Sequence, residues 1–198
     1  MRWSRILTTI MLFLVVLAGL TVLAGATTLV RGGLETLTAE NDLIVLGRVL
    51  DLHSYWNAGR THILTDLRVR VEEVLKGTPS ATEVTLRLLG GTVGEWSTLL
   101  VGGPELVPGS EYVLFLSRRE ILPGTGEAYM IPDHIQGVFD VVSAAGASSK
   151  AGPGGRNAVS QGNRHPLLPD EKGIAEPAGG AEGLPLEELI RQVRELAQ

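Results

Sequence analysis

The sequence predicts a mainly β protein: a small antiparallel β-barrel with a short N-terminal helix and one C-terminal amphipathic helix. Three observations predict this fold class. Short runs of alternating apolar and polar residues recur through the middle of the chain, as in strands that bury one face. Clusters of glycine, proline and asparagine separate these runs at hairpin spacing. Only the end of the chain has the apolar spacing of a helix that buries one side.

Composition narrows the classes of function. The chain has 198 residues, of which 44% are hydrophobic, enough for one domain with its own core. Its formal net charge of −5 argues against a basic surface for nucleic acid. The absence of cysteine excludes disulfides, thiolate metal sites and a cysteine nucleophile. We expect no cofactor.

The first segment of the chain, residues 1–26, is typical of a secretory signal peptide. A basic start precedes an uncharged apolar run over 6–23, and small residues at 24–26 form a cleavage site. We therefore expect a secreted or periplasmic protein, and the absence of cysteine favours a bacterial envelope. The alternative is an uncleaved membrane anchor, because the apolar run is nearly long enough to span a bilayer.

The barrel domain is expected over residues 27–143, and its first elements are a helix and a strand. Leu34 and Leu37 lie three residues apart, which predicts a short helix near 33–41. Residues 42–52 are apolar at both alternate sets of positions, as in a strand covered on both faces. Gly47 within that strand indicates a bulge or a bend.

Two hairpins should follow. Residues 54–64 hold Asn57 and Gly59 between strand-like runs, and we expect Gly59 to supply a left-handed turn residue. The return strand alternates until a phase slip at Glu72 and Glu73, which predicts a bulge. Lys76-Gly77 is followed by another strand pattern and not by a helix, so it predicts a hairpin connection and not a phosphate loop.

The last strands are separated by turn formers. Residues 90–94 predict a bend or a mobile loop, and Pro108-Gly109 suits a type II turn. Residues 111–117 predict a central strand. The segments on either side of Pro132-Asp133 predict a final hairpin.

The chain should end in a linker and a helix. Residues 144–183 are rich in glycine, alanine, serine and proline and contain no aromatic residue, so we expect a disordered linker. Residues 184–198 carry one apolar stripe, with acidic residues at the start and basic residues near the end, which predicts a helix. Because such a helix is marginal alone, we expect it to pack on the barrel's own exposed seam. The alternative is that the linker lets the helix release from the barrel and engage another protein.

Three stretches carry a family resemblance: "AENDLIVLGRVLDL" at 39–52, "LRVRVEEVLKG" at 67–77 and "PGSEYVLFLSRR" at 108–119. They resemble successive strands of the netrin-like module and of the tissue inhibitors of metalloproteinases. The pattern is also similar to uncharacterised secreted bacterial proteins. The resemblance, over about 39–142, implies an OB-fold barrel. The inhibitors chelate the protease metal through an N-terminal cysteine, which this chain lacks, so no inhibitory residue carries over.

His53 and His62 are the candidate metal ligands. They lie on opposite arms of the hairpin over 54–64 and its flanks, where they could face each other, with Asp51 or Asp66 as a carboxylate partner. The alternative is two ordinary strand histidines, because a change of register by one residue would separate them.

The candidate binding residues are Tyr55, Trp56 and Trp96. The first two lie at a hairpin tip and the third lies in the loop after Gly94, where binding modules place stacking or hot-spot contacts. The alternative is that these rings cap the ends of the barrel as part of the core. No catalytic residue is assigned, since Asp133-His134 is better explained as a turn and no serine lies in a nucleophile elbow.

The function predicted from these observations is an exported, non-enzymatic binding or interaction module. Its partner would be another protein or an envelope polymer, and not nucleic acid; a membrane would be involved only if the first segment is retained. One alternative is an extracytoplasmic metal-binding protein or hydrolase that uses His53 and His62. Another is a membrane-anchored structural or assembly factor of the envelope.

Overall fold

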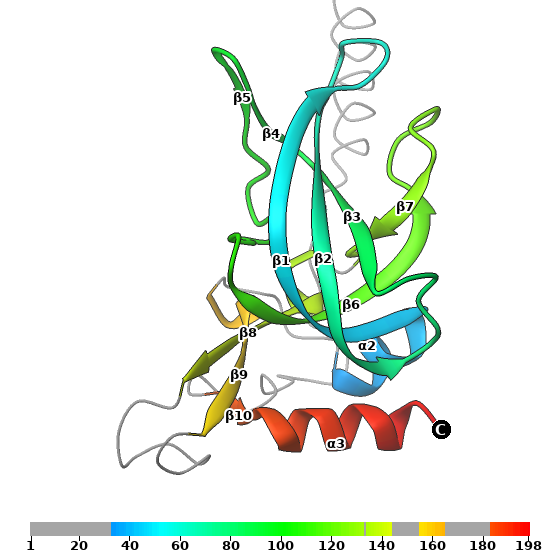
Figure 1. The fold of residues 1–198 in the computed structure, drawn as a ribbon, viewed down its shortest axis with the longest axis vertical. Helices are drawn as coiled ribbons and strands as arrows, with labels where there is room; N and C mark the ends of the chain where they lie inside the picture. Colours follow the sequence, from blue (N-terminus) through cyan, green and yellow to red (C-terminus); the bar gives the residue numbers. More distant parts are fainter. Residues whose placement is uncertain (1–32, 133, 144–154, 165–182) are drawn as a thin grey trace, which may run out of the picture.

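The structure is a computed structural model that describes residues 33–132, 134–143, 155–164 and 183–198. The predicted signal peptide lies outside the described residues, as does most of the predicted linker. The described part is mainly β, with a helix near each end of it (Figure 1). Within it, no helix is both long and apolar enough to cross a membrane.

The elements follow one another in a simple order. A short helix precedes the first two long strands, seven further short or medium strands follow, and a final two-residue strand leads into the last helix. Their bounds are α2 (Leu34–Glu40), β1 (Leu43–Trp56), β2 (Ile63–Lys76), β3 (Glu83–Leu89), β4 (Gly91–Val93), β5 (Trp96–Thr98), β6 (Glu111–Glu120), β7 (Glu127–Met130), η2 (His134–Gly137), β8 (Val138–Ser143), β9 (Arg156–Ser160), η3 (Gln161–Arg164), β10 (Leu184–Pro185) and α3 (Leu186–Leu196).

The main sheet has the order β1-β2-β3-β7-β6-β8-β9-β10, and β1 pairs additionally with β6. β1 therefore has hydrogen-bonded neighbours on both sides, β2 and β6. All these pairings are antiparallel except that of β3 with β7, which is parallel and joins only Leu86 to Tyr129. β4 and β5 form a separate two-stranded sheet.

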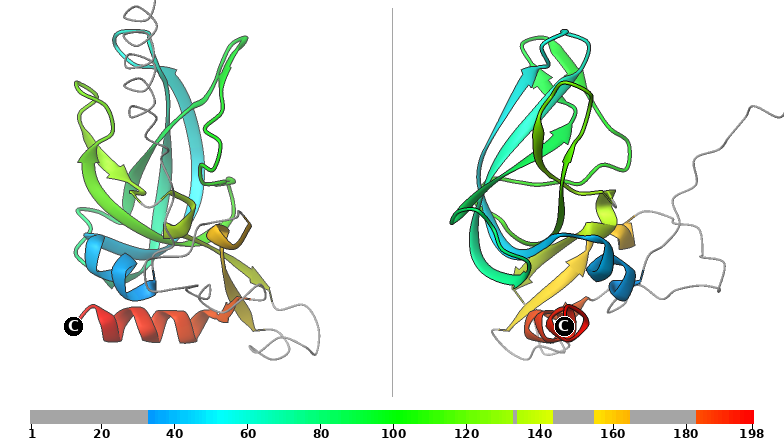
Figure 2. Two further views of the ribbon diagram at one scale, coloured as in Figure 1. Left: turned by 180° about the vertical axis from the view of Figure 1, so that it is seen from behind. Right: turned by 90° about the vertical axis from the view of Figure 1, so that its right-hand side faces the viewer.

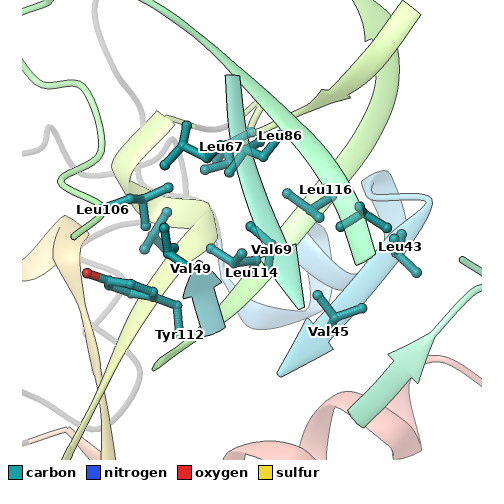
Figure 3. Packing of buried hydrophobic residues seen from close by; sticks show 13 residues of the cluster. Leu43, Val45, Val49, Leu67, Val69, Leu86, Leu106, Tyr112, Leu114 and Leu116 are labelled. Atoms are coloured by element: carbon teal, nitrogen blue, oxygen red, sulfur yellow. The ribbon is translucent and has the colours of Figure 1, made fainter. Parts of the chain in front are cut away.

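β1 and β6 bury both faces, as the apolar pattern of residues 42–52 predicts. Leu43, Val45 and Val49 of β1 point into one core, where they meet side chains of β2, β3 and β6 (Figure 3). Ile44 and Leu46, the residues between them, belong to a second core. Because successive side chains of a strand point to opposite faces, one strand supplies two cores.

The second core lies under the two helices, which run along the same side of the sheet (Figure 2). Leu189, Ile190 and Val193 of α3 are buried there with Phe115 and Phe139. β10, which directly precedes α3, pairs with β9. Near the other end of the helix, Arg194 forms an ion pair with Glu73 of β2. The prediction of a C-terminal helix is thus confirmed, and the helix is packed on its own sheet.

The irregularity predicted at Gly47 and the bulge predicted at Glu72 and Glu73 are the same bulge in the pairing of β1 with β2. Gly47 pairs with Val71 and Leu46 pairs with Glu73, so Glu72 is the extra residue. A Cβ at Gly47 would lie 2.8 Å from Val69 Cγ1 and 2.9 Å from the carbonyl oxygen of Arg70. The glycine lets the two strands approach closely where the bulge bends them.

The first hairpin is confirmed, with one correction. Trp56 pairs with Ile63, so the hairpin lies within 54–64 as predicted and its turn covers 57–62. The residue with left-handed backbone is Arg60 (φ 54°), however, and not Gly59. Asn57 stabilises this turn because its Oδ1 accepts hydrogen bonds from the backbone N–H groups of Thr61 (2.8 Å) and His62 (3.1 Å).

The connection at Lys76-Gly77 leads from β2 to β3, as predicted. Gly77 has a φ of +81°, and a Cβ there would lie 2.2 Å from the carbonyl oxygen of Asp42. The Lys76 ammonium donates hydrogen bonds to the carbonyl oxygens of Thr38 (2.6 Å) and Asn41 (2.8 Å). These carbonyls belong to the C-terminal end of α2, where helix backbone acceptors lack partners. The lysine therefore binds main chain.

The prediction of a final hairpin around residue 132 is wrong. β7 pairs with residues 117–120 of β6 and β8 pairs with residues 112–114, so each pairs with β6 and not with the other. The segment between them contains the turn of helix η2. Turn formers mark where a chain changes direction but do not determine which strand it pairs with next.

The predicted linker also needs correction. Residues 156–160 form β9, which pairs with both β8 and β10, and η3 follows it directly. Ala158 is buried in the second core. The strand could not be predicted from the composition of residues 144–183. Backbone hydrogen bonds to β8 and β10 hold β9, and such bonds do not require a run of apolar residues in the strand.

Candidate binding surface

Two hairpins project toward the same end of the molecule, the β1–β2 hairpin and the smaller β4–β5 hairpin (Figures 1 and 2). Trp56 ends β1 and Trp96 begins β5. Their rings meet edge to face, with centroids 6.4 Å apart and planes inclined by 71°. Trp96 is 69% exposed, whereas Trp56 is partly buried. The structure thus brings together two of the three predicted binding residues.

Gly90 and Gly91 allow the β4–β5 hairpin to lie against the first hairpin. A Cβ at Gly91 would lie 2.2 Å from Thr65 Oγ1 and 2.5 Å from Ser54 Oγ. Both glycines have positive φ, 99° and 128°. The Thr65 hydroxyl donates to the carbonyl oxygen of Gly90 (2.6 Å), and the backbone N–H of Gly90 donates to Ile63. The bend predicted at residues 90–94 is an ordered connection from β3 to β4 at Gly90.

Tyr55 belongs to a polar cluster. Its ring stacks on His53, with centroids 6.0 Å apart, and its hydroxyl donates to Asp66 Oδ2 (3.1 Å). Arg87 binds both oxygens of Asp66 (2.7 and 2.8 Å) and lies over the Tyr55 ring at 5.9 Å. Burial, and then the charge of Asp66, raise the pKa of Tyr55. The side-chain hydrogen bond to Asp66 is the largest cause that raises the pKa of Arg87.

The two candidate metal ligands do not face each other. His53 pairs with Asp66, whereas His62 lies in the turn, where its carbonyl accepts from the N–H of Asn57. Because Asn57 is the residue opposite His62, the two histidines are offset by four residues along the hairpin. At the usual rise of a strand this offset is about 13 Å, which is too far for both to bind one ion. His62 Nδ1 lies instead 2.9 Å from Thr61 Oγ1. Within the described ranges, no group of three or more His, Asp or Glu side chains could hold a metal ion.

An apolar pocket of about 550 Å³ lies beside the aromatic pair, between the ends of the main strands and the segment that follows β5. Sequence reasoning missed it. The signal in the sequence is "TLLVGG" at 98–103, an apolar run without alternation that ends in two glycines. Its apolar lining comes from Leu52, Leu67, Leu88, Leu89, Leu99, Leu100, Val101, Pro104, Leu106, Ile121, Met130 and Ile131.

The far end of that segment is held firmly. Gln161 of η3 accepts a hydrogen bond from the N–H of Glu105 (2.9 Å) and donates to its carbonyl oxygen (2.7 Å). The Gln161 side chain also donates to Asp140 (2.8 Å). The Tyr112 hydroxyl accepts from the N–H of Val107 (2.9 Å). By contrast, Leu99 and Val101 are 86% and 90% exposed. The apolar segment therefore projects from two fixed ends.

Comparison with known proteins yields no relative on which to base a function. No protein-family model matches the chain, and no curated protein matches it.

Proposed function

We propose that this protein is an exported, non-enzymatic binding module that contacts its partner through the tips of the β1–β2 and β4–β5 hairpins. The observation that carries the proposal is the exposure of Trp96 at 69%, next to the exposed Leu99 and Val101 on the same projecting segment. Large apolar side chains exposed together on one short segment are typical of interaction sites. Tryptophan is among the residues that contribute most to binding.

The pairing of Trp56 with Trp96 favours binding because it fixes the exposed ring. The edge-to-face contact and the glycine crossing at Gly90-Gly91 hold the second hairpin against the first. A ring already held in place loses little conformational freedom when a partner covers it. Another protein or an envelope polymer is the proposed partner, and the N-terminal sequence pattern supports export.

The scaffold that presents this surface is proposed to be a closed barrel of OB type, related to the netrin-like module. The succession of pairings β1-β2-β3-β7-β6, with β6 also paired to β1, supports closure. The parallel contact of β3 with β7 is the weakest link of that succession. Strand patterns at 39–52, 67–77 and 108–119 support the family.

Binding of the purified mature chain to isolated cell-wall polymer, and separately to solubilised envelope proteins, tests the proposal. Trp96→Ala should weaken binding about tenfold or more, because a central aromatic contact is lost. Val142→Ala is the matched control, since Val142 is 43% exposed on β8, outside both hairpins. Equal binding by the Trp96 variant and the wild type, in both fractions, would remove the proposed surface.

A further inference from the structure

We propose that the pocket beside the aromatic pair is a ligand site that takes the alkyl or acyl chain of a monomeric amphiphile and leaves the head group in water. The pocket holds about 550 Å³, within the range of small-molecule sites. This inference shares Leu99 and Val101 with the proposed partner surface but not Trp96, which does not line the pocket, so the Trp96→Ala variant tests the partner surface separately.

The chemistry of the wall selects a hydrocarbon. The described lining is mainly aliphatic and includes no aromatic ring, so an aliphatic ligand finds a match there and a flat aromatic ligand finds no stacking surface among these residues. Thr65 and Arg87, the polar side chains contributed by β2 and β3, are already engaged: Thr65 binds Gly90, and Arg87 binds Asp66 and the carbonyl oxygen of Thr125 (2.5 Å). Neither has to be freed for a chain to enter.

The charges around the pocket argue for a single molecule and against a bilayer surface. Asp66 neutralises Arg87, so the lining residues that the structure describes offer no free cation to an anionic head group. Glu95 and Glu105 are exposed on either side of the apolar segment, and the chain has a net charge of −5. Both features oppose docking on an anionic membrane. The ligand is therefore taken up as a monomer.

The segment over 98–103 would cover the bound chain. Leu99 and Val101 line the pocket and yet are 86% and 90% exposed, so neighbouring residues cover little of either side chain. Gly102 and Gly103, at the end of the segment, permit backbone change there. An alkyl chain in the pocket would give both side chains a surface on which to be buried.

The test uses the purified chain with octanol, decanol and dodecanol, with decanoate, and with anionic vesicles. Each added methylene should tighten binding of the alcohols about fourfold until the pocket is filled. Decanoate should bind no more tightly than decanol, because the wall contains the carboxylate of Glu105 and its guanidinium, Arg87, is paired with Asp66. Affinity that does not rise with chain length, or binding to vesicles without binding to monomers, would overturn the proposal.

Two further measurements locate the site. Leu100→Asp, which puts a charge in the wall at a residue 39% exposed, should reduce decanol binding at least tenfold, whereas Val142→Asp at a residue 43% exposed should leave it unchanged. Methyl NMR of the wild-type chain needs no variant. Decanol should shift Leu67, Leu88 and Ile131, and not Leu189 and Ile190 under α3. Shifts confined to the residues under α3 would contradict the assignment.

Discussion

At residue scale, several charged groups in this protein bind backbone carbonyls or side chains of neighbouring strands. The Lys76 ammonium binds three carbonyl groups at the end of α2, and it joins β2 to that helix across 38 residues of sequence. A lysine beside a glycine resembles a phosphate-binding element in the sequence alone. Its three-dimensional partners are main-chain oxygens, so its role is structural.

Replacing Lys76 by methionine should lower the free energy of unfolding by about 1–3 kcal/mol, because the acceptors at the end of α2 lose a charged donor. Urea denaturation measures the change. Arg70→Met is the control: Arg70 has a side chain 58% exposed and reaches Glu83 only at 3.7 Å, so it should change stability by less than about 0.5 kcal/mol. Equal effects of both variants would refute the structural role of Lys76.

Tyr55 should ionise at higher pH than an ordinary tyrosine, since burial and the nearby charge of Asp66 both raise its pKa. Absorbance during a pH titration measures this, with Tyr55→Phe identifying its contribution. Because the folded state holds this proton more tightly than the unfolded state, the associated stability is present below pH 10 and is lost as the pH rises through the folded pKa. Asp66→Asn should bring the pKa down; no change would mean that Asp66 exerts no effect.

At the scale of elements, α3 is part of the core. Leu189 and Val193 are fully buried against the outer face of the sheet, and β10 fixes the start of the helix through its pairing with β9. A helix held by buried leucines and a strand pairing is bound more firmly than a helix on a tether. A regulatory release of α3 therefore has no support in these contacts.

Leu189→Ala should lower the free energy of unfolding by about 2–5 kcal/mol, because it leaves a cavity between α3 and the sheet. Leu196→Ala, at the end of the same helix and 44% exposed, is the matched control and should cost far less. Chemical denaturation of both variants compares them. If Leu189→Ala were as stable as the wild type, the helix would not be docked in solution.

At the scale of the whole molecule, two cores share β1 and β6. Neighbouring residues of β1 alternate between the two cores. A displacement of β1 would therefore disrupt the packing of both cores at once. The two cores are expected to unfold together, in one transition.

The cooperativity of the cores is tested by Val45→Ala and Ile44→Ala, neighbours on β1 that face opposite cores. Each variant should shift one common unfolding midpoint, and far-ultraviolet and near-ultraviolet circular dichroism should coincide for both. Separate transitions for the two signals would mean that the helix-covered core unfolds independently.

Much of this fold could be predicted from local patterns. The double-sided apolar run at 42–52, the bulge at Gly47 and Glu72, and the stripe of the last helix each follow from the geometry of a single element. The error at residue 132 and the missed β9 both concern which strand pairs with which. That choice depends on contacts between distant residues, which alternation does not encode.

The residues of the candidate site could be predicted from the sequence, but their contacts could not. Trp56 and Trp96 could be selected by residue type and by their positions near turns, because exposed aromatics at loops are recognisable. Their contact could not be predicted, because it depends on Gly90 and Gly91 bringing the second hairpin against Thr65. The separation of His53 from His62 likewise depends on a register that turn residues do not fix.

By itself, the amino-acid sequence determined the mainly β class, the two-sided burial of the first strand and the amphipathic last helix, because each follows from the periodicity of residues close in the chain. The tertiary structure decided the order of the strands, the strand hidden in a glycine-rich stretch and the apolar pocket under residues 98–103. These features arise where segments far apart in sequence meet, and a hollow between them has no signature in any one segment.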